Sequence, residues 1–472
     1  MGPTTPHPHR RAPAIRTGVA VFTVLVGLVA VACSAPDRST SAAASATSTT
    51  ASSIDPGPGP TSITTNLRTT EVAKGFDRPS ALANRPMRNQ LWIAERAGRV
   101  RVVSLEADWN LETGRSVRGG YHTYPETVLD ISGDVSQSGE RGVLGMAFST
   151  DGTKVFLSWV NGRGEIVVAS WSVTDPVEPP TTTTLSPTPA LPPTPDSSTT
   201  TTTRPGPTTT TTIERTPLPV PAVEGRTRRV LLTIPREGDT NYGGHLVLGR
   251  DGYLYVGVGD ATQGASARNA QDPESLLGKL LRIDPGGATL TDAYSIPASN
   301  PWAKGKGAPP VFTIGMHDPL RFSFDRQNGD LWIGDAGEGA TQEIVMLSAA
   351  SGAGRGANLG WPLVEGSTPP PSGAPAGIVA PLLAFDSGGG NCPVIGGYVY
   401  RGQAISSLRG VYVYGERCSG AISGVLQRRG RLLDSKPLGA RVGNDSLVAF
   451  GQDDQGELYV VLSNGNLLRL VA

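Results

Sequence analysis

One turn and the strand after it decide the fold of this chain, and they lie in residues 239–284, DTNYGGHLVLGRDGYLYVGVGDATQGASARNAQDPESLLGKLLRID. The segment Tyr253–Val258 is aromatic and β-branched, begins after the turn pair Asp251–Gly252 and ends at Gly259–Asp260. Such a segment, bounded by turn residues on both sides, is typical of a short strand. Polar residues stand on either side of it, Asn241 before and Asp260 after, and both are candidates for a site.

The same turn-and-strand phrase occurs six times. The copies are 89–93 NQLWI, 151–156 DGTKVF, 251–256 DGYLYV, 328–333 NGDLWI, 409–413 RGVYV and 455–460 QGELYV. No segment between them has the apolar periodicity of an amphipathic helix, so we expect an all-β fold. Repeats of this kind predict a six-bladed β-propeller, in which each blade is a four-stranded antiparallel sheet. The alternative, two stacked β-sandwich domains, does not predict one phrase six times.

The composition separates a globular part from two low-complexity segments. Residues 34–65 and 176–223 consist largely of Ser, Thr, Ala, Pro and Gly, so we expect a disordered tether and an insertion that interrupts a propeller spanning residues 66–472. The chain has 41 basic and 41 acidic residues, and no cluster of Lys and Arg is interleaved with aromatic residues. A nucleic-acid partner is therefore not expected.

The N-terminus has the features of an export signal. Arg10, Arg11 and Arg16 precede an uncharged run, residues 17–32, which is shorter than the roughly 20 residues of a membrane-spanning helix. Small residues stand directly before Cys33, as in the lipobox of bacterial lipoproteins. We expect residues 1–33 to be a signal peptide, with Cys33 lipidated and the exported monomer anchored to the outer face of the cell membrane. The alternatives are an ordinary signal peptide with an incidental cysteine, and an uncleaved anchor.

The two remaining cysteines are candidates for a disulfide. Export places Cys392 and Cys418 in an oxidising compartment, with no third partner once Cys33 is used. Such a bond would stabilise the fold by roughly 3 kcal/mol in the chain-entropy model. Two free buried thiols are the alternative.

Phrases outside the repeats resemble those of a known family. They are 139–148 GERGVLGMAF, 276–285 LLGKLLRIDP, 321–325 RFSFD, 358–362 NLGWP and 396–402 GGYVYRG. Together, and in this order, they resemble the pyrroloquinoline-quinone-dependent sugar dehydrogenases, also called glucose/sorbosone dehydrogenases. The resemblance implies a six-bladed propeller, pyrroloquinoline quinone (PQQ) and Ca²⁺ as cofactors, and a sugar or polyol as substrate.

The family's catalytic base is replaced in this chain. In the family, a histidine in a His-Asn-Gly-Gly-like turn takes the proton of the anomeric hydroxyl, and an aspartate 19 residues later orients it. Asp260 matches the aspartate, whereas the position of the histidine is Asn241. An amide cannot accept the proton, and loss of a positioned base costs roughly 10² to 10⁴ in rate. His245, about 13 Å further along an extended strand, is expected to be a strand side chain; the alternative is that it replaces the base.

The predicted cofactor site also differs from the family pattern. The family's Arg-Asn pair, which meets the quinone carboxylates, falls at His317 and Asp318. An imidazole beside a carboxylate would repel an anionic cofactor unless a cation lies between them. His317 is then either a new base or a polar loop residue packed against Asp318. Arg401 matches a family lysine that contacts the quinone.

Other family positions persist. Glu140 matches a polar side chain that meets the sugar, and the main-chain oxygens of Gly337 and Glu338 match ligands of the cofactor's calcium ion. Glu343 and the carbonyl of Leu359 match part of a second, structural calcium site. Ligation by oxygen atoms from loops suits Ca²⁺. The alternative for Glu343 is a solvated charge.

Two functions follow from these residues. One is a quinone-dependent oxidoreductase of aldose sugars or related alcohols with degenerate catalytic positions. The other is a non-catalytic carbohydrate- or protein-binding propeller at the cell surface. For either function we expect Asn241, Asp260, His317 and Arg401 to meet at one central mouth.

Overall fold

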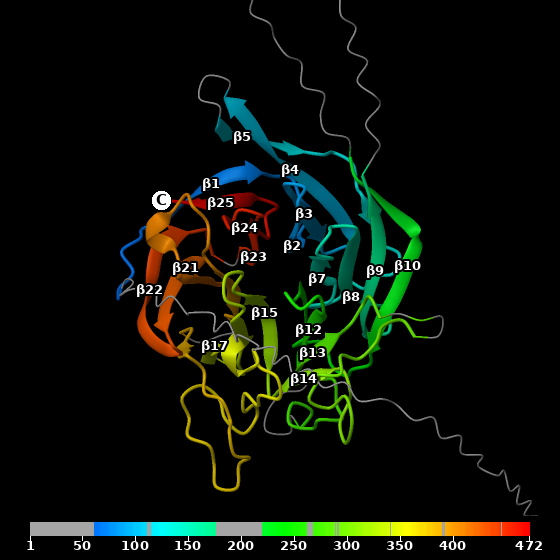
Figure 1. Ribbon diagram of the computed structural model, residues 1–472, viewed down its shortest axis with the longest axis vertical. Helices are drawn as coiled ribbons and strands as arrows, with labels where there is room; N and C mark the ends of the chain where they lie inside the picture. Colours follow the sequence, from blue (N-terminus) through cyan, green and yellow to red (C-terminus); the bar gives the residue numbers. More distant parts are fainter. Residues whose placement is uncertain are drawn as a thin grey trace, which may run out of the picture. The chain divides into compact units, whose positions relative to one another are not determined.

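The computed structural model describes residues 61–110, 115–175, 220–261, 268–287, 289, 292–339, 341–388, 392–444 and 446–472. Its strands form six sheets arranged around a common axis (Figure 1). The helical elements within these residues are two single 3₁₀ turns, η1 (Ala349–Ser351) and η2 (Ser406–Leu408). The prediction of an all-β, six-bladed propeller is confirmed.

The first three blades follow one another along the chain, and each is antiparallel. Blade 1 contains β2 (Pro79–Arg85), β3 (Gln90–Glu95), β4 (Arg99–Asn110) and β5 (Arg115–Thr123), with β6 (Leu129–Asp130) paired to β4. Blade 2 contains β7 (Val143–Phe148), β8 (Lys154–Val160), β9 (Ile166–Thr174) and β10 (Ala222–Ile234). Blade 3 contains β11 (Gly243–Leu248), β12 (Leu254–Val258), β13 (Lys279–Ile283) and β14 (Val311–Ile314).

The last three blades complete the ring. Blade 4 contains β15 (Asp318–Phe324), β16 (Leu331–Ala336), β17 (Thr341–Leu347) and β18 (Leu383–Asp386). Blade 5 contains β19 (Val394–Val399), β20 (Tyr412–Glu416), β21 (Ala421–Arg428) and β22 (Arg431–Arg441). Blade 6 contains β23 (Leu447–Gln452), β24 (Leu458–Leu462), β25 (Leu467–Val471) and β1 (Arg68–Ala73). Because β1 pairs with β25, residues from both ends of the propeller close the ring.

The repeated phrase marks the same place in every blade. Each copy is the turn that leads from the innermost strand into the second strand, which is β3, β8, β12, β16, β20 or β24. The innermost strands β2, β7, β11, β15, β19 and β23 contact one another around the axis. The six copies in the sequence therefore correspond to the six blades.

Aromatic side chains fill the spaces between neighbouring blades. Each phrase places one buried aromatic residue on the second strand of its blade: Trp92, Phe156, Tyr255, Trp332, Tyr412 and Tyr459. Trp332 stacks on Tyr412 with the ring centroids 4.4 Å apart, which joins blade 4 to blade 5. Six large apolar clusters occupy the six interfaces. The inner strands are thus buried on both faces, which explains why they have nearly continuous apolar sequences.

The propeller extends beyond the boundary that the sequence predicted at residue 66. Ile63 is buried in the apolar cluster between blades 5 and 6, and its N–H donates to Asp434 Oδ2 at 2.7 Å. Thr65 is also buried and donates to Ser407 Oγ at 2.9 Å. These residues belong to the propeller because an apolar side chain and a bonded hydroxyl pack against blade 5.

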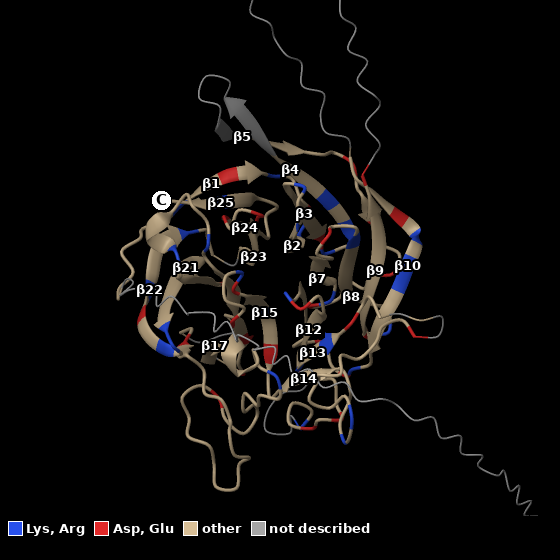
Figure 2. Cartoon of the chain, viewed as in Figure 1, with Lys and Arg blue, Asp and Glu red and all other residues tan. Residues whose placement is uncertain are grey.

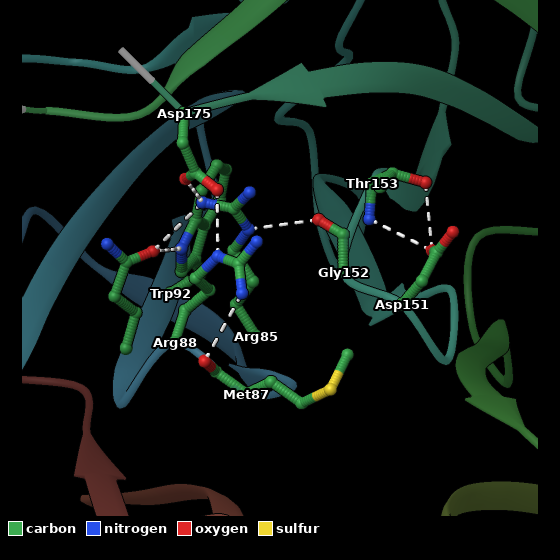
Figure 3. Close-up of polar contacts among 9 residues, drawn as sticks. Arg85, Met87, Arg88, Trp92, Asp151, Gly152, Thr153 and Asp175 are labelled. Atoms are coloured by element: carbon green, nitrogen blue, oxygen red, sulfur yellow. Dashed lines mark hydrogen bonds and ion pairs between the residues drawn. The ribbon is translucent and has the colours of Figure 1, made fainter. Parts of the chain in front are cut away.

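Two arginines anchor the chain where the Thr/Pro-rich insertion begins. Asp175 follows β9 and forms ion pairs with Arg85 at 2.5 Å and with Arg88 at 2.7 Å (Figure 3). Arg85 also donates to the carbonyl of Gly152, so it connects blade 1 to blade 2. After the insertion, β10 begins at Ala222, which makes residues 222–223 part of blade 2 and not of the insertion.

The close approach of β7 and β11 gives a test of the packing. A Cβ atom on Gly145 would lie 2.5 Å from Gly244 O and 2.8 Å from Leu246 N. We therefore expect Gly145→Ala to lower the free energy of unfolding by about 1–3 kcal/mol, the usual cost of overpacking. Urea unfolding of the full chain measures this. Gly162→Ala is the control, because no heavy atom lies within 4 Å of its added Cβ. Equal losses in both variants would contradict the assignment.

Candidate active site

A cavity of about 450 Å³ lies where the six innermost strands begin. Its lining includes one residue from the start of each of these strands: Pro79, Val143, Gly243, Asp318, Ile395 and Leu447. The second strand of a blade runs back toward this end, so residues that follow it, such as Arg96 and Gly337, also reach the cavity. A cavity of this size can hold a small molecule.

Asn241 lies in a tight turn at the centre of the site. Its φ of +56° is in the left-handed region, and Gly243 and Gly244 follow with φ of +60° and +80°. Its N–H donates to Glu140 Oε2 at 3.2 Å. Its side-chain Nδ2 lies 3.4 Å from Asp260 Oδ1 and 3.0 Å from His317 Nε2. The turn thus brings together an amide, two carboxylates and an imidazole from four different loops.

Asp260 is the buried anchor of this arrangement. The residue is fully buried, and its Oδ2 accepts a hydrogen bond from Trp361 Nε1 at 2.5 Å. Its N–H donates to His317 O at 2.9 Å. Asp260 therefore holds both the side chain of Asn241 and the backbone of His317.

His317 is fixed in one tautomer by its surroundings. Its Nδ1 lies 2.5 Å from Ala336 O, and only a protonated Nδ1 can donate to a carbonyl. The ring also packs edge-on against Trp361, with centroids 4.6 Å apart. Nε2 is then the unprotonated nitrogen that accepts from Asn241 Nδ2, and His317 lines the cavity. The bond to Ala336 O fixes the ring, and the acceptor nitrogen faces the side chain of Asn241.

The carboxyl groups beside His317 are desolvated. Asp318 is buried, and its Oδ1 accepts from Gly243 N–H at 2.9 Å. Burial, followed by repulsion from Glu140, raises the pKa of Asp318 to about 6, against the attraction of His317. Asp335 accepts from the N–H groups of His317 and Asp318, and burial raises its pKa well above the usual range. Because these raised pKa values favour the protonated form, Asp318 and Asp335 together carry less negative charge near neutral pH than two ordinary carboxylates would.

The lining carries more positive than negative side chains. Among its described residues, Arg78, Arg96, Arg321 and Arg417 stand against Glu140 and Asp318. Arg321 lies on β15, and desolvation inside the ring lowers its pKa to about 10. Over the ring as a whole, basic and acidic residues are interspersed (Figure 2). The excess of arginine in the cavity favours an anionic ligand.

A buried lysine supports the site from behind. Lys279 is fully buried, and its Nζ donates to Ala270 O at 3.0 Å, to Leu277 O at 2.7 Å and to Asn269 O. Burial lowers its pKa to about 7. Asn269 in turn donates to Asp260 O at 3.2 Å. The lysine thus organises the loop that holds Asp260.

His245 and Arg401 lie away from the cavity lining. His245 on β11 is buried against Phe322, with ring centroids 5.2 Å apart, and burial lowers its pKa well below the usual range. The interpretation of His245 as a strand side chain agrees with this position. Arg401 follows the far end of β19, where it forms an ion pair with Asp325 at the far end of β15. The expectation that Arg401 reaches the central mouth is wrong, because β19 runs away from the cavity before the chain reaches it.

The predicted calcium ligands do not all line the cavity. Gly337 lines it, and Glu338 follows directly. Glu343 on β17 is buried, so it is not a solvated surface charge; its Oε1 accepts from Gly366 N–H at 2.5 Å, and burial raises its pKa to about 7. Leu359 is a buried core residue whose N–H donates to Ile314 O. In the described part of the chain, no group of three or more His, Cys, Asp or Glu residues is arranged to hold a metal ion.

The predicted disulfide is present and lies at the cavity rim. Cys392 and Cys418 are bonded, and their neighbours Pro393 and Arg417 both line the cavity. Cys33, the rest of the predicted signal peptide and most of the two low-complexity segments lie outside the described residues. Within the described residues, no helix has the length and apolar character needed to cross a membrane.

Several residues of the site were not predicted from the sequence. They are the cavity residues Arg78, Arg96, Arg321 and Arg417, and Trp361, which bonds Asp260. Arg321 and Trp361 lie within the segments that carry the family resemblance. The other three, Arg78, Arg96 and Arg417, lie at predictable positions next to strands. Arg78 directly precedes an innermost strand, whereas Arg96 and Arg417 directly follow a second strand. The six phrases therefore locate the cavity residues once they are assigned to blades.

Comparison with protein families gives one match. A family model described as "Glucose / Sorbosone dehydrogenase" matches residues 197–469, which is more than half of the chain.

Two curated proteins are similar to part of the chain. The HIPL1 protein of Arabidopsis thaliana is 27% identical over 282 residues, covering 50% of this chain and 40% of that protein. The Hedgehog-interacting protein of Homo sapiens is 31% identical over 268 residues, covering 53% of this chain and 36% of that protein. The chain thus spans less than half the length of either relative.

Solved structures share the fold over most of the chain. A PQQ-bound aldose sugar dehydrogenase from Streptomyces coelicolor has a TM-score of 0.56 and 19% identity, covering 86% of this chain and 97% of that one. An oxidoreductase from Thermus thermophilus, described as a glucose dehydrogenase, has a TM-score of 0.57 and 23% identity, covering 86% and 100%. At these identities the likeness shows a common propeller fold.

The raised pKa of Asp318 gives a test of the site's electrostatics. Because its folded pKa, about 6, lies above its ordinary value of 3.8, this carboxyl contributes stability that is fully present below about pH 4 and is lost as the pH rises through 6. Asp318→Asn removes the ionisation and keeps an acceptor for Gly243 N–H. We expect the variant to be more stable than the wild type by about 1–3 kcal/mol at neutral pH and equally stable near pH 4. Thermal unfolding at the two pH values measures this; the same difference at both would contradict the assignment.

Proposed function

This chain belongs to the glucose/sorbosone dehydrogenase family, and on that premise we propose that it is a sugar oxidoreductase whose proton acceptor is His317. One observation carries the proposal: His317 Nε2 lies 3.0 Å from the side chain of Asn241, at the place where the family has its base. Its Nδ1 bond to Ala336 O leaves Nε2 with a lone pair.

The residues around His317 define a proton transfer. The anomeric hydroxyl of the substrate replaces Asn241 Nδ2 as the hydrogen-bond partner of His317 Nε2 and gives its proton to this nitrogen. The C1–H bond breaks with its electron pair and a C1=O bond forms, so an aldose becomes a lactone. Asn241 remains bonded to Asp260 and donates toward the hydroxyl oxygen. General-base catalysis of this kind typically contributes about 10² to 10⁴ in rate.

The lining fits an anionic quinone cofactor in charge and size. Four arginines oppose two acidic residues, one of which, Asp318, has its pKa raised to about 6. Arg321, beside Asp318 on β15, would hold a carboxylate of PQQ. When bound, the quinone would accept the hydride that leaves C1. The cavity of about 450 Å³ can accommodate a small planar cofactor.

A calcium ion fits beside Gly337. A Cβ atom at this glycine would clash with Glu365 Oε1, a buried oxygen without a hydrogen-bond partner among the described residues. Burial raises the pKa of Glu365. The main-chain oxygens of Gly337 and Glu338 with this carboxylate would hold Ca²⁺, which prefers oxygen ligands. The bound cation would also offset the charge of the carboxylates around His317.

Asn241 favours a second candidate function. An amide at the base position suits a propeller that binds a carbohydrate or a protein without redox chemistry. Similarity to a protein named Hedgehog-interacting protein supports this alternative. The two functions differ in whether the bound quinone is reduced.

Reconstitution separates the two candidates. Full-length protein with PQQ and Ca²⁺ is assayed for dye reduction over a panel of aldoses. We expect turnover, and we expect His317→Gln to lower kcat by about 10² to 10⁴ without loss of quinone binding. His122→Gln, a histidine outside the cavity, is the control. Full activity in His317→Gln would exclude His317 as acceptor, and a wild type that binds no quinone in a thermal-shift assay would leave the binding function.

Export and lipid anchoring are also proposed, on the basis of residues 1–33. Cys33 with its preceding small residues supports lipidation of the mature N-terminus. We expect Cys33→Ala to move the protein from the membrane fraction to the soluble exported fraction, because one protein-linked diacyl anchor would be lost. Fractionation of expressing bacterial cells measures this. A wild type that is already soluble would contradict lipidation.

A further inference from the structure

Three guanidinium groups surround the part of the cavity next to Glu140. Arg78, Arg96 and Arg417 all line it, and we call them the arginine arc. Arg78 precedes β2 and Arg96 follows β3, so both come from blade 1, whereas Arg417 follows β20 of blade 5. All four lining arginines carry the same charge. The arginine arc differs from Arg321 in position, because Arg321 lies on β15.

Arg96 is built into the loop that carries Glu140. Its Nε donates to Arg141 O at 2.7 Å, and its Nη2 donates to Gly139 O. Gly142 makes this possible, because a Cβ atom there would clash with Arg96 Cγ. Arg96 is therefore bonded to the residues on both sides of Glu140.

The other two arginines are also held in place. The N–H of Arg96 donates to Arg78 O at 2.9 Å, and Arg78 Nη2 donates to Gln137 Oε1 at 2.7 Å. Arg78 has a φ of +45°, a left-handed conformation that is uncommon for a non-glycine residue. Arg417 is adjacent to the disulfide, and its N–H donates to Pro393 O at 3.2 Å.

The arginine arc carries three positive charges, and its acidic neighbours are Glu140 and Asp77, which lies 3.6 Å from Arg78. Burial and then repulsion from Arg78 and Arg417 lower the pKa of Arg96, and Glu140 acts in the opposite direction. Glu140 also accepts the N–H of Asn241 at 3.2 Å, so it is shared with the catalytic turn. An anion in this part of the cavity would relieve the repulsion among the three guanidinium groups.

We propose that the arginine arc binds the carboxylate of a uronic acid, so that the substrate is an acidic sugar and not a neutral aldose. This inference rests on the proposed function, because it takes His317 as the group that meets C1. In the pyranose form, a uronic acid carries its carboxylate on C5, across the ring oxygen from the anomeric carbon, so the carboxylate and the anomeric hydroxyl can meet different groups of one cavity. Arginine binds carboxylates through paired N–H groups, which fixes the orientation of the ring.

The bonds of Arg96 favour a substrate over a cofactor. Arg96 is bonded on both sides of Glu140, the residue that the resemblance places against the sugar. Arg321 lies instead beside Asp318, where the family meets its quinone. The arginine arc and Arg321 thus serve different carboxylates.

Binding measurements test the proposal independently of turnover. Glucuronate and glucose are titrated into the full chain by calorimetry without PQQ, and again with PQQ present. We expect glucuronate to bind at least about tenfold more tightly than glucose, with or without PQQ, because each bidentate arginine contact adds a charge-assisted bond. Arg417→Gln should weaken glucuronate binding about tenfold and leave glucose unchanged. Arg431→Gln, an exposed arginine outside the cavity, is the control.

The outcomes also separate this proposal from the proposed function. Glucuronate binding without any turnover would support the arginine arc while the oxidoreductase proposal fails. Turnover of neutral aldoses with equal affinity for glucose and glucuronate would support the oxidoreductase and overturn the arginine arc. Competition between glucuronate and PQQ that disappears in Arg417→Gln would assign the arginines to the cofactor and also overturn the proposal. Because Arg417 is exposed, its substitution leaves the fold intact.

Discussion

The structure depends on burying both faces of six small sheets. A four-stranded sheet of short strands cannot form a core alone, so each blade packs against two neighbours. The contacts are made by the apolar clusters between the blades. Aromatic residues of the second strands contribute to five of the six clusters, as Trp332 and Tyr412 illustrate between blades 4 and 5. Because β1 joins β25, the ring closes and every interface is occupied. No helix is needed to cover a sheet, in contrast to parallel α/β folds.

The same arrangement creates the site. All six innermost strands begin at one end of the ring, so the loops before them and the loops after the second strands meet there. The strands hold these loops through regular ladders: Asp318 pairs with Ala336, and Gly243 pairs with Val258. His317, Asn241 and Asp260 each stand within a few residues of such a pair. Their side chains are consequently positioned by rigid strands, which suits catalysis or specific binding.

The two departures from the family pattern lie in direct contact. By the family resemblance, Asn241 falls at the position of the family's histidine and His317 at the position of its arginine. In the folded chain their side chains meet at 3.0 Å, so an imidazole remains at the site although it comes from another blade. Compared position by position, the chain lacks the family's histidine and its arginine. In the folded structure, an imidazole still lies beside Asn241. The buried carboxyls Asp318 and Asp335, with raised pKa values, reduce the repulsion that an anionic ligand would meet.

The sequence by itself determined the number of blades, the second strand of each, the family and the disulfide. The blade number and the second strands follow from a repeated local pattern, and the family follows from the order of the segments that resemble it. The disulfide follows from the presence of two cysteines in the globular part. The tertiary structure alone decided which residues share the cavity. Arg401 was misplaced because its position depends on the direction of β19. The family resemblance placed Asn241 and His317 at one mouth, but the direct contact of their side chains, 76 residues apart in the chain, is visible only in the folded structure. Closure of the ring brings residues of different blades into contact. Their separation along the sequence does not indicate how far apart they lie in space.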